Sequence, residues 1–122
     1  MTTEDRGPGS ASGRNSAVSR VDVTGGEAVI VLRGEVDLST VGQVELEAKR
    51  LIEAGKTSLV FDFTAVTFFD SACLSALVKA REAALEHGGQ VVLRNVGRYG
   101  MRILEITRLA DVFEIQHDSE ER

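Results

Sequence analysis

The chain has 122 residues, 43% of them hydrophobic, which predicts one globular domain with its own core. Its 14 basic and 19 acidic residues give a formal charge of −5, which argues against a nucleic-acid surface of clustered lysine and arginine. No segment approaches the roughly 20 apolar residues that span a bilayer, and the N-terminus lacks the apolar core of a signal peptide. We therefore expect a cytoplasmic protein that binds neither nucleic acid nor membranes.

Potential metal ligands are few. Cys73 is the single cysteine, so an internal disulfide and a zinc site built from several cysteines are both excluded. His87 and His117 are the only histidines, and metal sites need clustered ligands. The sequence therefore predicts no metal centre, and we expect no cofactor.

The first 20 residues are rich in glycine, serine and arginine, contain the only proline, and show no periodicity. Such a segment cannot bury enough apolar surface to offset the entropy of ordering. We expect residues 1–20 to form a flexible tail, residues 21–117 to form the domain, and residues 118–122 to form a short C-terminal tail.

The domain is predicted to begin with a hairpin. Extended runs at residues 21–23 and 27–34 flank Gly25 and Gly26, which is a pattern typical of a tight turn between two strands. The hairpin is expected to contribute antiparallel pairing at one edge of the sheet.

A helix is predicted at residues 41–54, where apolar residues recur at spacings of three and four. Thr40 and Gln43 fit an N-terminal capping box, and Gly55 fits the end of the helix. The next segment, residues 57–66, is almost continuously apolar, as in a parallel strand covered on both faces.

A second helix is predicted at residues 72–87, with Leu77, Ala84 and Leu85 on its apolar face. Helices between successive strands imply right-handed crossovers and a largely parallel sheet. The predicted fold class is α/β, a single domain with a mixed, mostly parallel sheet of about five strands and three helices. The remaining elements are a strand at 90–96, a helix at 98–110 and a short strand at 112–115.

Asp70 and Ser71 mark the junction between the apolar strand and the second helix. Both residue types satisfy the free N–H groups of a first helical turn, so capping is the plain interpretation. A first-turn side chain at the carboxyl edge of a sheet can also face solvent, where the helix terminus tolerates added negative charge. Of the two aromatic residues before them, Phe68 is expected to lie in the core and Phe69 to be partly exposed.

Ser71 lacks the surroundings of a catalytic nucleophile, which needs a general base and an oxyanion site. The window around it does not match G-x-S-x-G, and His87 lies 16 residues further on in the same predicted helix. At about 1.5 Å of rise per residue, that histidine is more than roughly 20 Å away. We therefore predict no catalytic residues and no enzyme activity.

Two other kinds of protein that handle phosphate, a phosphoacceptor receiver domain and a protein with a phosphate-binding loop, also fit this sequence poorly. A phosphoacceptor receiver domain would place an aspartate at the end of a middle strand and a lysine late in the chain. Asp62 lies within a predicted strand instead, and no lysine follows Lys79. No G-x-x-x-x-G-K-[ST] phosphate-binding loop is present either.

Four segments resemble the STAS domain of bacterial anti-sigma factor antagonists, and together they extend over about residues 21–117. The most specific part of the resemblance is the Asp-Ser pair that follows two hydrophobic residues at a strand end, supported by "GEVD" upstream. The segments are "LRGEVDLSTVGQVELEAKRLI", "LVFDFTAVTFFDSACLSALVKA", "GGQVVLRNV" and "ILEITRLADVFEI".

The resemblance implies a phosphorylation switch that regulates transcription, typically in a stress response. In the unphosphorylated state, members of the family bind an anti-sigma factor that is also an ATP-binding serine kinase, and a sigma factor is thereby released. The kinase phosphorylates the serine that follows the aspartate, which is Ser71 here, and this ends the binding. A separate phosphatase restores it.

The resemblance also implies which residues meet the partner. Phosphorylation adds about −1.5 to −2 charges, which would repel the partner beside Asp70 and, if the two loops meet, Asp37. For Glu35 and Asp37 a solvated strand end remains the alternative, and for Thr40 a helix cap. The implied partner-binding residues are Glu35, Asp37, Thr40, Asp70, Ser71, Ala72 and Cys73.

Two positions depart from the family pattern. Cys73 stands where most relatives have glycine, and a side chain there is expected to narrow the approach of the partner. Its sequence position leaves open a small buried hydrophobe or a reactive thiolate at a helix N-terminus. Arg108 occupies a position that is often glycine. The few residues after Ile115 predict a shortened C-terminal helix.

Two other functions remain open. The first is a STAS scaffold that assembles with other domains and is not switched at Ser71. The second is a module that binds a nucleotide or another small ligand.

Overall fold

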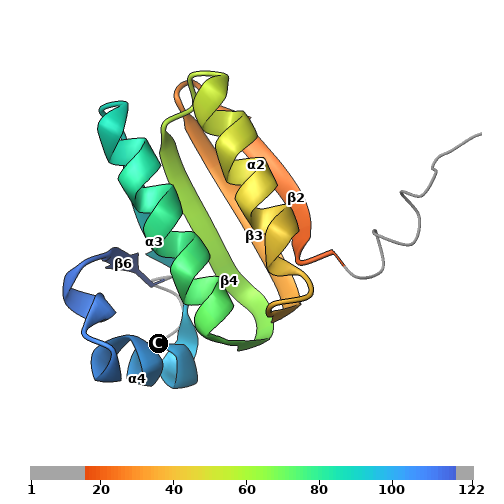
Figure 1. Cartoon of the computed structure of the whole chain (residues 1–122), viewed down its shortest axis with the longest axis vertical. Helices are drawn as coiled ribbons and strands as arrows, with labels where there is room; N and C mark the ends of the chain where they lie inside the picture. The colour runs from red at the N-terminus through yellow and green to blue at the C-terminus, as the bar shows by residue number, and fades with distance from the viewer. Residues whose placement is uncertain (1–15, 118–122) are drawn as a thin grey trace, which may run out of the picture.

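The computed structural model describes residues 16–117, so the predicted tails lie mostly outside the described residues, as does the predicted shortened C-terminal helix. A five-stranded sheet has the order β2-β3-β4-β5-β6 (Figure 1). β2 pairs with β3 antiparallel, and the other three pairings are parallel. This arrangement confirms the predicted α/β fold class. The strands are β2 (Val18–Thr24), β3 (Glu27–Val36), β4 (Ser58–Phe69), β5 (Gln90–Arg94) and β6 (Glu114–Gln116).

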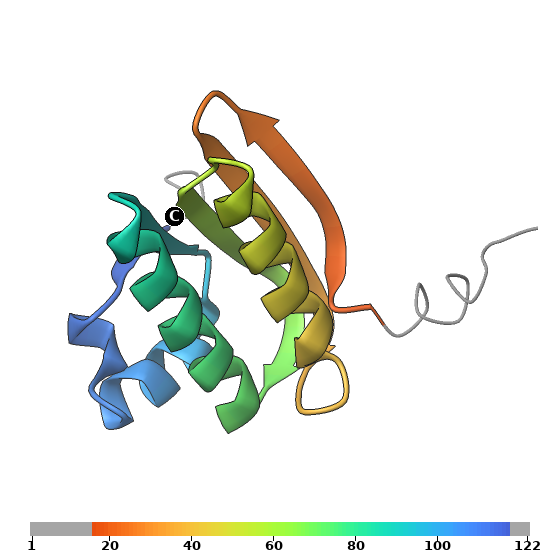
Figure 2. The same cartoon turned by 45° about the horizontal axis from the view of Figure 1, so that its top comes forward.

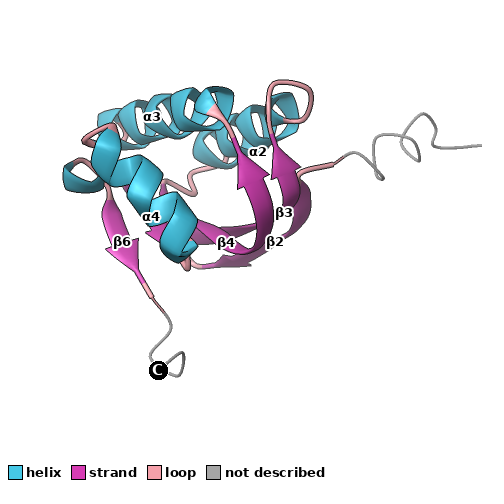
Figure 3. Ribbon diagram, turned by 90° about the horizontal axis from the view of Figure 1, so that it is seen from below, coloured by secondary structure: helices cyan, strands magenta, loops and turns pink. Residues whose placement is uncertain are grey.

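The two longer helices, α2 (Val41–Glu53) and α3 (Ser71–Glu86), lie side by side on one face of the sheet (Figures 2 and 3). The shorter α4 (Gly97–Ile106) lies beside α3, near the end at which α3 begins (Figure 1). A single 3₁₀ turn at Leu109–Asp111 connects α4 to β6. The three predicted helices are therefore all present, in the predicted order.

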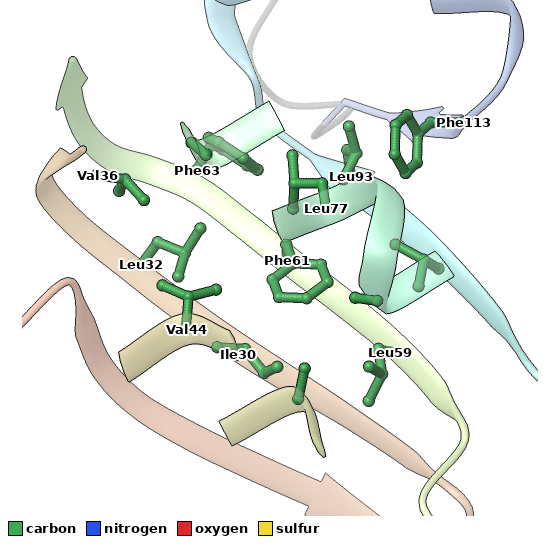
Figure 4. Close-up of a cluster of buried hydrophobic side chains, with 14 of the residues drawn as sticks. Ile30, Leu32, Val36, Val44, Leu59, Phe61, Phe63, Leu77, Leu93 and Phe113 are labelled. Carbon is green, nitrogen blue, oxygen red and sulfur yellow. The ribbon is translucent and has the colours of Figure 1, made fainter. Parts of the chain in front are cut away.

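The core lies between the sheet and the α2–α3 layer (Figure 4). Alternate residues of β3 and β4 face the helices, because successive side chains of a strand point to opposite faces. Leu77 of α3 and Val44 of α2 meet them from the helical side. The fully buried strand residues include Ile30, Leu32, Val36, Leu59, Phe61 and Leu93.

The first strand begins earlier than predicted. β2 starts at Val18, and the backbone N–H of Arg33 donates to the Ala17 carbonyl at 2.9 Å. Ala17 is 1% exposed, and its own N–H donates to Gln43 Oε1 at 3.1 Å. The assignment of residues 18–20 to the tail was therefore wrong, because pairing with β3 orders a segment whose composition alone indicates disorder.

The predicted capping box of α2 is also wrong. Thr40 is at the N-cap position but makes no side-chain cap bond, and the Gln43 side chain holds Ala17 instead. The Thr40 hydroxyl donates to the carbonyl of Glu35 at 2.9 Å. Both side chains therefore form hydrogen bonds to neighbouring segments, and neither caps the first turn of α2.

The apolar face predicted for α3 is only partly correct. Leu77 and Ala84 are buried, whereas Leu85 is exposed. At 3.6 residues per turn, Leu85 lies about 80° around the helix from Leu77, outside the arc that contacts the sheet. That arc is lined mainly by small side chains, namely Cys73, Ala76, Ala80 and Ala84.

The position of the site follows from unequal strand lengths. β5 ends at Arg94 opposite Asp62, whereas β4 continues to Phe69. Along residues 63–69, β4 therefore has β3 on one side, and the first turns of α4 pack near its end on the other. The end of β3, the end of β4 and the starts of α3 and α4 meet at one edge of the fold (Figure 1).

Candidate functional site

Asp70 is the N-cap of α3. Its backbone is extended, with φ −122° and ψ −170°, and its Oδ1 accepts hydrogen bonds from the N–H groups of Ala72 at 2.9 Å and Cys73 at 3.3 Å. These two bonds satisfy donors that the helix itself leaves free. The capping interpretation therefore holds for Asp70, and Ser71 becomes the first residue of the helix.

Asp70 also connects the two loops that carry the predicted site. Its Oδ2 accepts a hydrogen bond from the Leu38 N–H at 3.3 Å, and its own N–H donates to the Val36 carbonyl at 3.4 Å. The segment after β3 and the segment after β4 therefore lie together. This was the condition for Asp37 to add to the negative charge beside Ser71. One carboxylate spans both segments.

The loop after β3 is held by its own hydrogen bonds. The Asp37 N–H donates to Thr40 Oγ1 at 3.0 Å, and Asp37 Oδ1 accepts from the hydroxyl of Ser39 at 2.8 Å and from its N–H at 3.0 Å. The Ser39 hydroxyl is the main reason why the pKa of Asp37 lies below the ordinary value of an aspartate. Asp37 is therefore a fixed negative charge beside the start of α3.

Ser71 presents its hydroxyl to solvent. It occupies the first position of α3 and is exposed. Within residues 16–117, the Ser71 hydroxyl forms no hydrogen bond and has no histidine beside it. His87 is at the far end of the same helix, where its Nδ1 lies 2.9 Å from the Ala83 carbonyl oxygen. The Ser71 hydroxyl is therefore accessible to another protein, and no histidine lies beside it to act as a general base.

Cys73 does not lie on this surface. Its side chain is 1% exposed and packs in the core beneath α3. Burial, and secondly the charge of Asp70, raise the pKa of the thiol to about 12. Of the two alternatives for this residue, the small buried hydrophobe is therefore confirmed and the reactive thiolate is not. The expectation of a side chain that narrows the approach of a partner was wrong, because the helix turns Cys73 inward. Only the backbone N–H of Cys73 contributes to the capped first turn of α3, where it donates to Asp70 Oδ1.

The aromatic pair before Asp70 is oriented opposite to the prediction. Phe69 is buried and makes edge-to-face contacts with Phe63, at a centroid separation of 5.7 Å, and with Tyr99 at 6.3 Å. Phe68 points to the other side of the strand and is 43% exposed. The reason is packing at the end of β4, where Phe69 lies under the start of α4.

Sequence reasoning missed an exposed apolar residue in the upstream loop. Leu38 is 79% exposed, although leucine usually favours the interior. Together with Phe68 it places apolar surface beside the Asp70–Ser71 pair. The sequence does contain a signal for this exposure. Leu38 stands among polar residues in "EVDLST" and belongs to no periodic apolar pattern.

Two kinds of feature are absent from the described part of the chain. No group of three or more histidine, cysteine, aspartate or glutamate residues in it is arranged to hold a metal ion. No helix between residues 16 and 117 is long and apolar enough to cross a membrane.

The model of the STAS domain family matches residues 18–122. The chain belongs to the STAS domain family. The match covers the whole of the fold described above and includes both segments that meet at Asp70.

Solved structures share the STAS fold. An anti-sigma factor antagonist from Mycobacterium paratuberculosis is 26% identical, with a TM-score of 0.68 over 84% of this chain and 86% of that one. An anti-sigma factor antagonist (STAS) domain protein from Planctomyces limnophilus is 21% identical, with a TM-score of 0.71 over 84% and 92%. The Bacillus cell fate determinant SpoIIAA, in its phosphorylated form, is 22% identical, with a TM-score of 0.68 over the same shares.

Most of the predicted site residues of this STAS domain share one edge of the fold. Glu35 is exposed near the end of β3, and Asp37 and Thr40 form the loop that follows it. Asp70 and Ser71 begin α3 directly beside that loop, with the half-buried Ala72 behind them. The side chain of Cys73 alone is directed into the core.

Proposed function

We propose that this STAS domain is an anti-sigma factor antagonist switched by phosphorylation of Ser71. In the unphosphorylated form it binds an anti-sigma factor that is also an ATP-dependent serine kinase, and a sigma factor is released. The exchange takes place in the cytoplasm, and a phosphatase reverses the modification. The observation that carries the proposal is the Ser71 hydroxyl, which is exposed at the start of α3 without a hydrogen-bond partner in residues 16–117.

In this proposal the chain is a substrate and not an enzyme. The kinase transfers the γ-phosphoryl group of ATP to the Ser71 oxygen, a base of the kinase takes the hydroxyl proton, and ADP leaves. The hydroxyl needs no activation from its own chain, which agrees with the absence of a neighbouring base at the start of α3. Exposure in the first helical turn gives the kinase access from outside the fold.

The local electrostatics support a switch that leaves the fold intact. A phosphate on Ser71 lies at the N-terminus of a 16-residue helix, where the helix dipole stabilises negative charge. The same phosphate follows directly on Asp70, whose carboxylate is hydrogen-bonded to the loop that carries Asp37, a carboxyl with a lowered pKa. A phosphate in place of the hydroxyl adds to the negative charge of Asp70 and of the neighbouring loop, and a partner adapted to the unmodified surface is repelled by the modified one.

The apolar side chains beside Ser71 provide the attraction in the unphosphorylated state. Leu38 and Phe68 are both exposed, and apolar anchors near the centre of an interface contribute most of its binding free energy. A partner that covers them must place its own groups within reach of the Ser71 hydroxyl. Binding and phosphorylation then compete for one surface.

Two substitutions of Ser71 test the proposal with the cognate anti-sigma factor. Ser71→Ala should bind within about threefold of the wild type, because a small exposed side chain contributes little, and it should accept no phosphate. Ser71→Glu should bind at least about tenfold more weakly, because it places negative charge where the partner meets a hydroxyl. Affinity is measured by isothermal titration calorimetry.

Ser75 provides the matched control, since it is exposed on the same helix one turn further on. Ser75→Glu adds the same charge to α3 and should leave the affinity unchanged. The proposal is wrong if Ser71→Glu binds as tightly as Ser75→Glu does.

A further inference from the structure

A small hollow separates the end of β4 from the first turn of α4. Its volume is about 180 Å³, and it is lined by Phe68, Phe69, Arg98 and Tyr99 together with neighbouring backbone. Phe68 therefore borders two features at once, the Ser71 surface on one side and this hollow on the other. The hollow has room for one side chain of a partner and has an arginine at its rim.

The outer face of α4 continues from the hollow. Arg98 and Arg102 are one turn apart and exposed, and neither forms an ion pair with any residue that the structure describes. Tyr99 and Ile106 lie along the edge of the same face, two turns apart, and Ile106 is 71% exposed. The edge-to-face contact of Tyr99 with Phe69 places the start of this apolar edge next to the end of β4, two residues before Ser71.

The charge of this face differs from that of the rest of the chain. Residues 97–106, which form α4, contain two arginines and one glutamate, for a net charge of +1, and Arg108 follows just after the helix, whereas the whole chain carries −5. On the other side of Ser71, the loop after β3 carries Glu35 and Asp37. The edge of the fold is therefore acidic at one end, apolar in the middle and basic along α4.

We propose that the protein that binds the Ser71 surface also covers the hollow and the Arg98–Arg102 face of α4, and that it presents there an apolar side chain flanked by carboxylates. This inference rests on the proposed function, since it names further contacts of the same partner. It assigns α4 a role in recognition that is separate from the phosphorylated residue.

Interface size supports a single partner for both surfaces. A stable protein interface covers about 800 Å² on each side and about 20–30 residues. The start of α3 and the neighbouring loop at residues 37–40 comprise fewer residues than such an interface, and Phe68 with the hollow is apolar surface that adjoins them. An acidic surface of the partner is the complement of Arg98 and Arg102, which form no ion pair within residues 16–117, and such complementarity accelerates association and excludes other partners.

Charge reversal on α4 tests the inference. The probe is the purified anti-sigma factor kinase that phosphorylates the full-length wild-type chain. Arg98→Glu/Arg102→Glu should weaken its binding at least about tenfold and should flatten the dependence of affinity on salt concentration. Ile106→Ser should weaken binding several-fold without a change in salt dependence, since it removes apolar contact alone.

Lys49→Glu/Arg50→Glu is the matched control. It makes the same change in net charge in the last turns of α2, far along that helix from the Ser71 edge, and should bind like the wild type. Thermal melts establish that each variant is folded, and Arg98→Gln/Arg102→Gln replaces the α4 reversal if that variant does not fold.

The outcomes separate the two proposals. Loss of binding with Ser71→Glu but wild-type affinity and salt dependence in the α4 variants overturns the α4 surface and leaves the proposed function standing. Equal weakening by the α4 and α2 reversals also overturns the α4 surface, because the effect is then one of net charge. If the kinase does not bind the wild-type chain, both proposals fall.

Discussion

Asp70 and Ser71 are adjacent in the sequence but have different tasks. Asp70 accepts two hydrogen bonds from the first turn of α3 and one from Leu38, whereas the hydroxyl of Ser71 forms no hydrogen bond within residues 16–117. Under the proposed function, structural and regulatory roles are thereby divided between neighbouring residues. A serine that also capped the helix could not be modified without a loss of stability.

This division predicts different effects on stability. Asp70→Ala should lower the free energy of unfolding by about 1–2 kcal/mol, because the helix loses its cap. Ser71→Ala should change it by less than about 0.5 kcal/mol, as is usual for an exposed side chain without partners. Urea denaturation of both variants measures the difference, and equal losses of stability would contradict the assignment of the cap.

Cys73 predicts a pH dependence because its thiol is buried and neutral. Its pKa of about 12 lies above the value of roughly 8.5 for an unfolded cysteine. The protonated thiol therefore contributes stability that is fully present below about pH 8.5 and is lost as the pH rises toward 12. In Cys73→Ala, the free energy of unfolding should depend less on pH between about pH 8.5 and 10.

A thiol reagent provides the direct check of Cys73. At pH 8 the native chain should react with an aromatic disulfide reagent only as fast as it unfolds, whereas the chain in denaturant should react at once. Rapid and complete modification of the folded chain would show that the thiol is accessible, contrary to its position in the core.

At the scale of elements, two helical glycines have opposite effects. A Cβ at Gly100 would lie 2.3 Å from Val96 Cγ1 and 3.0 Å from Phe69 Cε2, whereas a Cβ at Gly42 would meet nothing within 4 Å. Gly100 is therefore required for the close approach of α4 to Phe69, and so for the position of α4 beside the site.

The matched pair of alanine substitutions follows from this difference. Gly100→Ala should destabilise the fold by about 1–3 kcal/mol through overpacking, and Gly42→Ala should stabilise it by up to about 1 kcal/mol through helix propensity. The change in melting temperature of each variant gives the sign of its effect on stability. A stabilising Gly100→Ala would mean that α4 does not pack on Phe69 as described.

The order and type of the elements could be predicted from the sequence because periodicity and glycine positions are local signals. The resemblance likewise predicted the two segments that carry Asp37 and Asp70. What depended on distant contacts could not be predicted in this way. Phe69 is buried by α4, which begins almost 30 residues later. Gln43 holds Ala17, 26 residues earlier, and so does not complete a capping box.

The end of α4 shows the same limit. Arg108 has φ +68°, the left-handed conformation that glycine adopts most easily. The sequence of this chain alone predicts a helix through residue 110, because alanine, leucine and arginine are good helix formers. The left-handed residue ends α4 at Ile106 instead and starts the 3₁₀ turn.

At the scale of the whole molecule, the core and the candidate site occupy separate parts of the fold. The sheet and the paired helices α2 and α3 bury the core, and the segments that carry the candidate site, at the ends of β3 and β4 and the starts of α3 and α4, lie at one edge (Figure 1). The switch therefore needs no rearrangement of the core. A phosphate on Ser71 changes the surface by more than one unit of negative charge, in a chain whose total is −5.

The central claim is that Ser71 is the residue through which the partner kinase switches this chain. The most direct measurement is phosphosite mapping by mass spectrometry after the full-length chain is incubated with its anti-sigma factor kinase and ATP. We expect a single phosphate on Ser71, none on Ser71→Ala, and loss of kinase binding in step with the phosphorylated fraction. A phosphate on another residue, with normal switching of Ser71→Ala, would contradict the account.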